Sequence, residues 1–166
     1  MKNHDFLIIG AGIFVITTAL ELHKRKYSIG ILNPDQIPHP LASSTDINKI
    51  VRMEYGSDRF YMDMADDCID IWHEWNDLFG ENLYHEVGFM LACPRAMESE
   101  KQTFEKASYD NLISKGHSPI RMEGDAISNR FPAFKKGKFI DGFYHPRAGF
   151  AESGRVVGKL TEYARQ

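Results

Sequence analysis

The chain has 166 residues, a formal net charge of −3 at pH 7, 43% hydrophobic residues and 26% charged residues. This length supports one ordinary domain with its own core and is too short for two large ones. The composition excludes disordered and fibrous proteins, and the slight negative charge gives no field that would attract nucleic acid or an anionic membrane surface. We therefore expect a folded protein with neither a nucleic-acid nor a membrane partner.

The two cysteines, Cys68 and Cys93, lie far apart and have no second pair with which to form a disulfide scaffold. This usage suits a reducing compartment, and we expect both side chains to be buried thiols. The uncharged run 6–20 contains glycine and threonine and is too short to span a bilayer, so we interpret it as neither leader nor anchor. We expect a cytoplasmic protein, or a peroxisomal one if a longer form carries a C-terminal signal.

The first elements form a strand–helix–strand unit. The apolar run 5–9, ended by Gly10, predicts a strand buried on both faces of a parallel sheet. Segment 12–26 has few helix breakers and ends in HKRK, and positive charge is favourable at a helix C-terminus. Segment 27–33 predicts the second strand, which gives the spacing of a right-handed crossover.

The next part of the chain contains a loop and a long helix. Three prolines and several small polar residues predict a long loop over 34–46, and segment 47–57 predicts one or two helical turns that break at Gly56. Segment 58–79 carries apolar residues at steps of three and four, which predicts an amphipathic core helix. We expect one stripe of this helix to face the core: Tyr61, Met64, Cys68, Ile71, Trp72, Trp75 and Phe79.

The remaining segments alternate between strands and helices. Segment 84–93 is strand-like, 99–116 predicts a polar amphipathic helix that stops at a glycine, and 137–146 predicts a strand pair or one bent strand. A final helix is predicted from residue 151 onward. Because such a helix normally returns the chain to a sheet, we expect either a sheet without its later strands or a fragment of a larger protein.

The glycine-rich turn after the first strand is the candidate nucleotide site. A nucleotide diphosphate needs a tight turn, a backbone free of obstructing side chains and free amides at a helix N-terminus. Gly10 and Gly12 meet the first two needs, and Ile13 and Phe14 would offer backbone amides. Val15 replaces the third glycine and should loosen helix–sheet packing. The site is predicted to be weakened but present; a glycine turn used only for packing is the alternative.

The residue that ends the second strand usually decides how the adenosine ribose is held. An Asp or Glu is typical there, but this chain has Asn33, whose amide oxygen accepts a hydrogen bond about half as strong. Asp35 in the following loop could substitute. No arginine directly follows the strand, so a 2′-phosphate has no clamp and NADP is disfavoured.

Three stretches resemble a known family: GAGIF at 10–14, IPHPLASSTDINKIVRMEYG at 37–56, and GFYHPRAGFAESGRVVGKLTEYAR at 142–165. They are similar to the FAD-dependent amino-acid and sarcosine oxidases of the D-amino acid oxidase superfamily, which include sarcosine, pipecolate, saccharopine and fructosyl-amino-acid oxidases. The family's members are more than twice as long, so the sequence resembles their N-terminal part. The resemblance implies FAD as cofactor and an incomplete α/β fold, in which a Rossmann-like FAD-binding βαβ layer adjoins the start of an antiparallel β substrate domain.

The resemblance also implies site residues in the second stretch. Ser43 and Ser44 would contact FAD phosphate or ribose, and Asn48 and Lys49 would lie near the isoalloxazine. A cation at Lys49 fits the chemistry because hydride transfer leaves negative charge on the flavin, so Lys49 is the candidate catalytic residue. An ordinary solvated lysine is the alternative. Arg52 could supply a second charge, but we favour a structural salt bridge.

For the other polar residues we predict neither metal binding nor acid–base catalysis. His39 and His145 stand beside prolines with no partner at metal-ligand spacing, so no metal is predicted. Glu54, Asp58 and Asp63 are interpreted as surface carboxylates or helix N-terminal charges rather than an acid–base pair.

The resemblance divides the chain into three segments. Residues 1–83 would form the first part of the FAD-binding domain, 84–145 the start of a substrate-binding α+β domain, and 146–166 the return to the FAD-binding domain. In the AESG motif of the last segment, Glu152 and Ser153 are interpreted as helix-capping residues.

The resemblance implies oxidation of a secondary amine or amino acid: hydride passes from the α-carbon to flavin N5, and oxygen then reoxidises the flavin to give peroxide. The family's later portion supplies most of the substrate pocket and the oxygen-activating lysine, so we expect this chain alone to be inactive. Two alternatives are a non-catalytic remnant or interaction module that retains the fold, and an NAD-linked dehydrogenase domain. The oligomeric state is not predicted.

Overall fold

The structure is a computed structural model that describes residues 3–99 and 103–166. The chain forms two compact units, one from residues 1–49, 79–83 and 151–166 and the other from 50–78 and 84–150. This geometric division differs from the predicted segments because 50–78 groups with the second unit. The assignment of segments to cofactor-binding and substrate domains stays a prediction.

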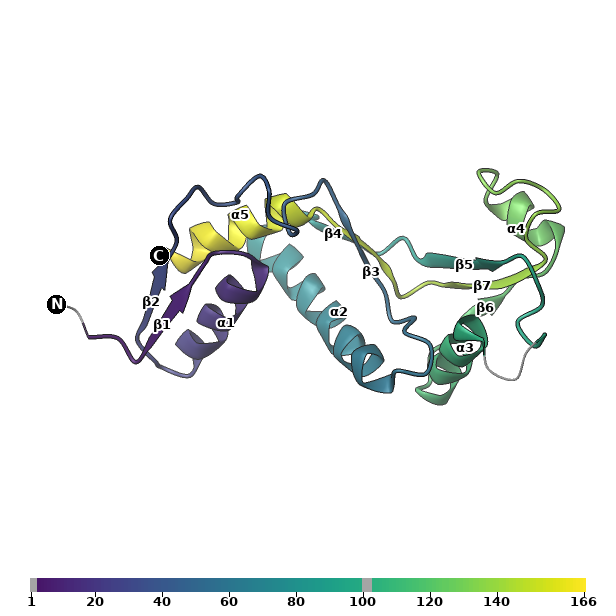
Figure 1. Ribbon diagram of the computed structural model, residues 1–166, viewed down its shortest axis with the longest axis horizontal. Helices are drawn as coiled ribbons and strands as arrows, with labels where there is room; N and C mark the ends of the chain where they lie inside the picture. Colours follow the sequence, from purple (N-terminus) through teal and green to yellow (C-terminus); the bar gives the residue numbers. More distant parts are fainter. Residues whose placement is uncertain (1–2, 100–102) are drawn as a thin grey trace. The chain divides into compact units, whose positions relative to one another are not determined.

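The first unit contains the predicted strand–helix–strand motif. Strand β1 (Phe6–Ile9) and strand β2 (Ile29–Leu32) pair in parallel, and helix α1 (Ile13–Lys24) connects them. Helix α5 (Ser153–Ala164) packs beside α1, as Figure 1 shows. The prediction of a crossover unit and of a final helix is confirmed.

The burial predicted for the first strand is wrong. Phe6, Leu7 and Ile9 are exposed and only Ile8 is half-buried. In the described residues β1 and β2 form a two-stranded sheet, so β1 has one neighbour and no second layer on the face of Leu7 and Ile9. An apolar run therefore predicted the strand, but its burial depends on partners that a local pattern does not contain.

The loop predicted over 34–46 has no helix or strand, but the helical turns predicted after it are wrong. Strand β3 (Lys49–Val51) occupies that position. The β-branched Ile50 and Val51 favour an extended backbone once a neighbouring strand is available. Strand β8 (Gly149–Ala151) provides that neighbour in a three-stranded sheet of order β3-β8-β4.

The second unit is built on an antiparallel sheet of order β5-β7-β6, and the prediction of an antiparallel sheet in this part of the chain is confirmed. Phe143, at its centre, is fully buried. Figure 1 shows β5 and β7 running side by side, with α4 at one end of them. Besides β3 and β8, the elements are α2 (Arg59–Phe79), β4 (Tyr84–His85), β5 (Phe89–Cys93), α3 (Phe104–Ser114), β6 (Ile120–Arg121), α4 (Asp125–Arg130) and β7 (Asp141–His145).

Helix α2 exists as predicted, but it buries a different face. Met62 and Ile69 are its buried residues, and the side chain of Asn76 fixes this face by bonding the N–H and C=O of Tyr84 at 2.9 and 2.8 Å. Of the predicted stripe, four residues are instead exposed: Tyr61, Met64, Cys68 and Ile71. The apolar spacing was compatible with two adjacent faces, and packing chose between them.

The two cysteines are both free thiols, but only one is buried. Cys68 is exposed, so the prediction of a buried thiol there is wrong, whereas for Cys93 it is confirmed. Burial and the nearby carboxylates of Glu105 and Asp141 raise the pKa of the Cys93 thiol to about 12. Within residues 3–99 and 103–166, no helix has both the length and the apolar character needed to cross a bilayer.

Candidate cofactor and substrate sites

The glycine-rich turn leads directly into helix α1. Gly10 adopts a φ of +106°, a conformation that favours glycine, and its N–H donates to the carbonyl of Leu32 at 2.7 Å. This bond ties the turn to the carboxyl end of β2. Gly12 is the N-cap of α1 and has no side chain that could cap the helix. The first amides of α1 are therefore free to bind an anion.

The mouth of this turn is open and partly polar. Phe14 is 85% exposed, so its ring does not fill the space in front of the helix. A Cβ placed on Gly12 would lie 3.7 Å from Oγ of Ser44, which brings this predicted phosphate contact to the turn from a distant loop. Val15 packs against the turn, with Cγ2 3.6 Å from the position of a Cβ on Gly10. The free amides of α1, the absence of a side chain at Gly12 and the nearby Ser44 hydroxyl fit the diphosphate of a dinucleotide.

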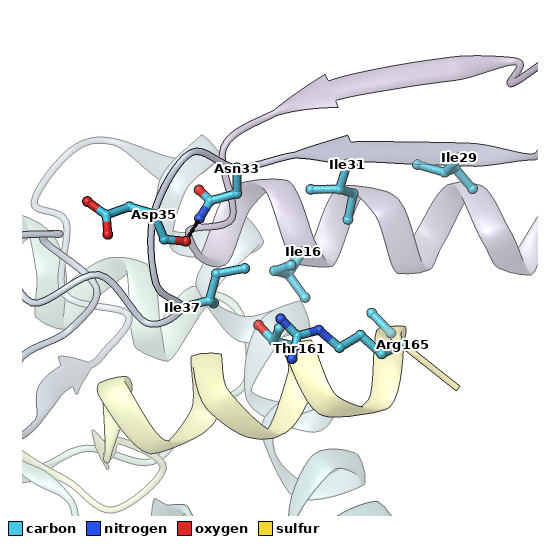
Figure 2. A pocket seen from close by; sticks show the side chains of 9 residues that line it. Ile16, Ile29, Ile31, Asn33, Asp35, Ile37, Thr161 and Arg165 are labelled. Carbon is cyan, nitrogen blue, oxygen red and sulfur yellow. Dashed lines mark hydrogen bonds between the residues drawn. The ribbon is translucent and has the colours of Figure 1, made fainter. Parts of the chain in front are cut away.

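Asn33, at the end of β2, is used within its own loop. Its Nδ2 donates to the carbonyl of Asp35, and the Asp35 carboxylate accepts from the N–H of Gln36 at 2.8 Å. His39 Nε2 lies 3.3 Å from the same carboxylate. In Figure 2 this carboxylate points away from the other labelled side chains. Asp35 therefore stabilises the loop, and Asn33 keeps its Oδ1 and its second Nδ2 hydrogen for a ligand.

A cavity of about 370 Å³ lies between β2, α1 and α5 (Figure 2). The residues of the glycine turn do not line it, so this cavity of mixed polar and apolar lining is separate from the candidate diphosphate site. Thr161 of α5 and Arg165, which directly follows α5, line it, and sequence reasoning missed both because no local pattern places α5 beside β2. The lining residues are Ile16, Ile29, Ile31, Asn33, Asp35, Ile37, Thr161, Ala164 and Arg165.

The residues predicted to lie near the flavin ring are at or just before β3. Lys49 is the first residue of β3, and its ammonium forms an ion pair with the carboxylate of Asp46. Asn48 and Ser43 are exposed, and Ser44 is half-buried. The structure thus brings Ser44 to the glycine turn and leaves the Lys49 charge paired within its own loop.

The start of α5 anchors this loop. The Ser153 hydroxyl donates to the carbonyl of Asp46 at 2.8 Å, and the Gly154 N–H donates to the same oxygen at 3.2 Å. Glu152 is the N-cap residue of α5 as predicted, but its side chain makes no capping bond and pairs with Arg155. Ser153 is the first residue of the helix and is bonded to the loop, so its predicted capping role is wrong. The AESG motif therefore positions the loop that carries Ser44 and Lys49.

In the second unit, the salt bridge expected for Arg52 is not found among the described residues, so that prediction is wrong. Among the described residues its Nη1 is buried and has no hydrogen-bond partner. Its Cζ lies 5.0 Å from the ring centre of Tyr55 and 5.6 Å from that of Phe89. Aromatic faces support a guanidinium but do not satisfy its N–H donors. Arg52 therefore keeps a buried N–H donor group that could bind an anion, and no local sequence signal revealed this.

Glu54 is not a surface carboxylate, so that prediction is wrong. Its side chain is fully buried, and Oε1 lies 2.9 Å from Nδ1 of His145, which is also buried. Asp58 and Asp63 do match the prediction: Asp58 accepts from the Tyr61 N–H at 3.2 Å near the start of α2, and Asp63 forms an exposed pair with Lys115. Across the described residues no group of three or more metal-binding side chains is present.

Comparison with known proteins identifies the family. Residues 5–166 match the model of the DAO family, described as FAD dependent oxidoreductase. The chain belongs to this family of FAD-dependent oxidoreductases, whose cofactor is FAD.

Individual relatives narrow this class. The chain is 36% identical to L-saccharopine oxidase of Schizosaccharomyces pombe, with 99% of the chain and 39% of that protein covered. It is 34% identical to human peroxisomal sarcosine oxidase, with 98% of the chain and 40% of that protein covered. The chain thus spans about 40% of the length of these curated relatives.

Solved structures agree on the fold. L-proline dehydrogenase from P. horikoshii is similar with a TM-score of 0.84 at 16% identity, over 99% of this chain and 42% of that one. Glycine oxidase from Bacillus cereus has a TM-score of 0.76 at 18% identity, over 98% of this chain and 44% of that one. The prediction of an α/β oxidase fold, present in part, is confirmed.

Proposed function

We propose that the chain carries the FAD diphosphate site and a substrate-carboxylate site of an enzyme that oxidises a secondary amine or amino acid. Family membership supports the FAD chemistry, and relatives named for sarcosine and L-saccharopine oxidation support the substrate class. The single structural observation that carries the proposal is Arg52, a half-buried guanidinium whose Nη1 is buried and unpartnered among the described residues. Sarcosine and saccharopine are carboxylates, which such a cation binds with charge-assisted hydrogen bonds.

The first unit would hold the cofactor. Ile13 and Phe14 would donate backbone amides to the diphosphate at the Gly10–Gly12 turn, and Ser44 would add a hydroxyl. Ser43 and Asn33 would reach ribose or phosphate at the two sides of the turn. Bound FAD supplies the hydride acceptor of the reaction.

Lys49, with Asn48 beside it, would stabilise negative charge that develops on the isoalloxazine. In the structure Asp46 neutralises Lys49, so this role requires the ammonium to leave Asp46. Replacing Asp46 by asparagine would release it. The carbonyl of Asp46 would still accept the bonds from Ser153 and Gly154, so the loop should keep its position.

A non-catalytic remnant is the second candidate. Two observations favour it: the Asn33 amide is bonded to its own loop, and Lys49 is paired with Asp46. Both contacts use polar groups that could otherwise contact FAD. An NAD-linked dehydrogenase has less support because the family model is that of FAD-dependent enzymes.

FAD binding tests the first unit's role. Titration of the purified chain, followed by flavin fluorescence, should show binding, and Gly12→Ala should weaken it about tenfold because the added methyl group blocks close approach of the diphosphate. That methyl group meets only Ser44 at an ordinary contact distance, so the fold should survive. Gly158→Ala is the matched control, since a Cβ there meets nothing within 4 Å.

Two further variants separate an impaired site from a remnant. Val15→Gly and Asn33→Asp restore the usual residues and should each strengthen FAD binding. No FAD binding by the parent or by the double variant would support the remnant and contradict the proposal. Peroxide release is then measured on FAD-loaded protein with sarcosine, pipecolate and saccharopine; for the 166-residue chain alone we expect no turnover.

A further inference from the structure

Glu54 and His145 form a buried pair to which the proposed function gives no role. Their exposed fractions are 0% and 1%, and their side chains meet at 2.9 Å. The other ring nitrogen of His145, Nε2, is buried and has no hydrogen-bond partner among the described residues. Burying such a pair costs more free energy than burying apolar side chains of the same size. Its presence therefore suggests a task other than stabilising the core.

The Glu54 carboxylate holds the backbone beside Arg52. Its second oxygen, Oε2, accepts the N–H of Met53 at 3.1 Å. That N–H belongs to the peptide bond joining Arg52 to Met53. One carboxylate thus bonds both to the chain adjacent to Arg52 and to His145.

His145 connects this carboxylate to the sheet. It is the last residue of β7 and lies opposite Phe89 of β5 in the antiparallel register. The ring of Phe89 is in turn one of the two aromatic faces next to the Arg52 guanidinium, at 5.6 Å. Glu54 and His145 thus connect the backbone next to Arg52 with Phe89, whose side chain contacts the Arg52 guanidinium.

The far end of the same loop is also fixed. The Gly56 N–H donates to Ser108 Oγ at 2.8 Å, and Asn111 Nδ2 donates to the Gly56 carbonyl at 2.7 Å. Both partners lie on α3. Behind His145 the ring of His117 is 5.3 Å away, and it is itself held by Asp66 at 3.2 Å. The backbone of the loop that carries Arg52 is therefore hydrogen-bonded on both sides of Glu54, at Met53 and at Gly56.

We propose that Glu54 and His145 are positioning residues that hold Arg52 in place for the substrate carboxylate. This inference rests on the proposed role of Arg52 as the carboxylate site. The pair acts through the Arg52–Met53 peptide and through Phe89, and it does not touch the substrate. Without it the guanidinium loses its fixed direction and binds a carboxylate less tightly, because ordering it then costs conformational entropy.

The test uses the whole 166-residue chain, labelled with ¹⁵N, and follows the Arg52 Nε–H signal by NMR. Acetate is the probe and acetamide its uncharged counterpart. The parent should respond to acetate and not to acetamide. Arg52→Met should abolish this preference, as judged from the backbone amides of the same loop. If Arg52→Met leaves the preference intact, the proposed carboxylate site is wrong, whatever Glu54 does.

Three variants of the pair then decide its role. Glu54→Gln can still bond Met53 and His145 and should keep acetate affinity within about twofold. In Glu54→Asp the side chain is one methylene shorter and cannot reach both partners, so the acetate affinity should fall about tenfold. The double variant Glu54→Leu/His145→Phe removes both side chains of the buried pair together, so that only the Met53 N–H loses its acceptor, and its acetate affinity should also fall about tenfold. Glu74→Gln, an exposed carboxylate on α2, is the matched control and should change nothing.

The heteronuclear NOE of the Arg52 Nε–H distinguishes positioning from plain stabilisation. It should fall in the Asp and double variants at temperatures where tryptophan fluorescence shows the second unit to be folded. Parental acetate affinity in Glu54→Asp, or in the folded double variant, would overturn the inference while leaving Arg52 as the carboxylate site. If the double variant does not fold, the difference in acetate affinity between Glu54→Asp and Glu54→Gln decides whether the pair positions Arg52.

Discussion

The two compact units differ in what they bury. In the second unit, β7 carries the mixed sequence DGFYH, yet four of its five residues are buried. In the first unit, β1 has the fully apolar sequence FLII, yet three of its four residues are exposed. Within the part of the chain that the structure describes, β7 lies between two neighbouring strands, whereas β1 has one. Exposure of a strand therefore follows the number of its partners more closely than its own hydrophobicity.

The units also differ in their polar groups. The second unit buries the Glu54–His145 pair and the carboxylate of Asp141, which pairs with the half-buried Arg121. In the first unit, the ion pairs of Arg155 with Glu81 and Glu152 lie at the surface, where such pairs contribute little to stability. We infer that the second unit depends on specific buried contacts and that the first depends mainly on its backbone and on α1–α5 packing.

The largest expected effect is at Gly142, in the centre of the second unit. Its φ is +152°, and a Cβ there would overlap the carbonyl oxygen of Leu91 on the paired strand. Gly142→Ala should destabilise this unit by about 4 kcal/mol or prevent its folding. Urea unfolding followed by tryptophan fluorescence reports on it, because both tryptophans of the chain, Trp72 and Trp75, lie in α2. An effect below about 1 kcal/mol would contradict the close approach of β5 and β7.

A smaller effect is expected at Asp141. Burial alone would raise the pKa of its carboxyl, but the Arg121 guanidinium and the N–H groups of Met97 and Gly142 lower it below the ordinary value of 3.8. A folded-state pKa below the unfolded one stabilises the protein above about pH 4, and this contribution is lost as the pH falls through the folded-state pKa. Asp141→Asn should therefore cost about 3 kcal/mol at neutral pH.

In the same variant the free energy of unfolding should also fall less steeply as the pH is lowered below about 4, because the group that titrates there has been removed. Urea unfolding at pH 7 and at pH 3 measures both effects by fluorescence. Asp77→Asn, on the exposed face of α2, is the control and should retain the parental curve. A parental difference between the two pH values in Asp141→Asn would show that another carboxyl carries the acid sensitivity.

The smallest effect is expected in the first unit. Ile9 is 78% exposed on β1, so Ile9→Ser should change the free energy of unfolding by no more than about 0.5 kcal/mol. Ile69→Ala, at a fully buried position of α2, should cost about 2–5 kcal/mol in comparison. Circular dichroism at 222 nm during thermal unfolding reports on both units. A cost above 2 kcal/mol for Ile9→Ser would mean that something in solution covers β1, for example a second copy of the chain.

Much of the fold could be predicted from the sequence because it is encoded locally. Apolar runs, a positive helix end and a glycine turn predicted β1, α1 and β2, and residue spacing predicted α2. The same glycines predicted an open helix N-terminus, and motifs at 37–56 and 142–165 identified the family. These signals involve residues close together in the chain, so neighbouring sequence suffices to specify them.

Contacts between distant residues were decided only by the tertiary structure. Glu54 and His145 are 91 residues apart, and Ser153 is 107 residues from the loop carbonyl it holds. The sequence therefore could not show that Glu54 is buried, that Arg52 has no carboxylate partner among the described residues, or that Arg165 lines a cavity beside β2. Local periodicity allowed either of two faces of α2 to be buried, and a strand or a helical turn at Lys49–Val51. Packing selects among such alternatives because burial free energy depends on which distant surfaces meet.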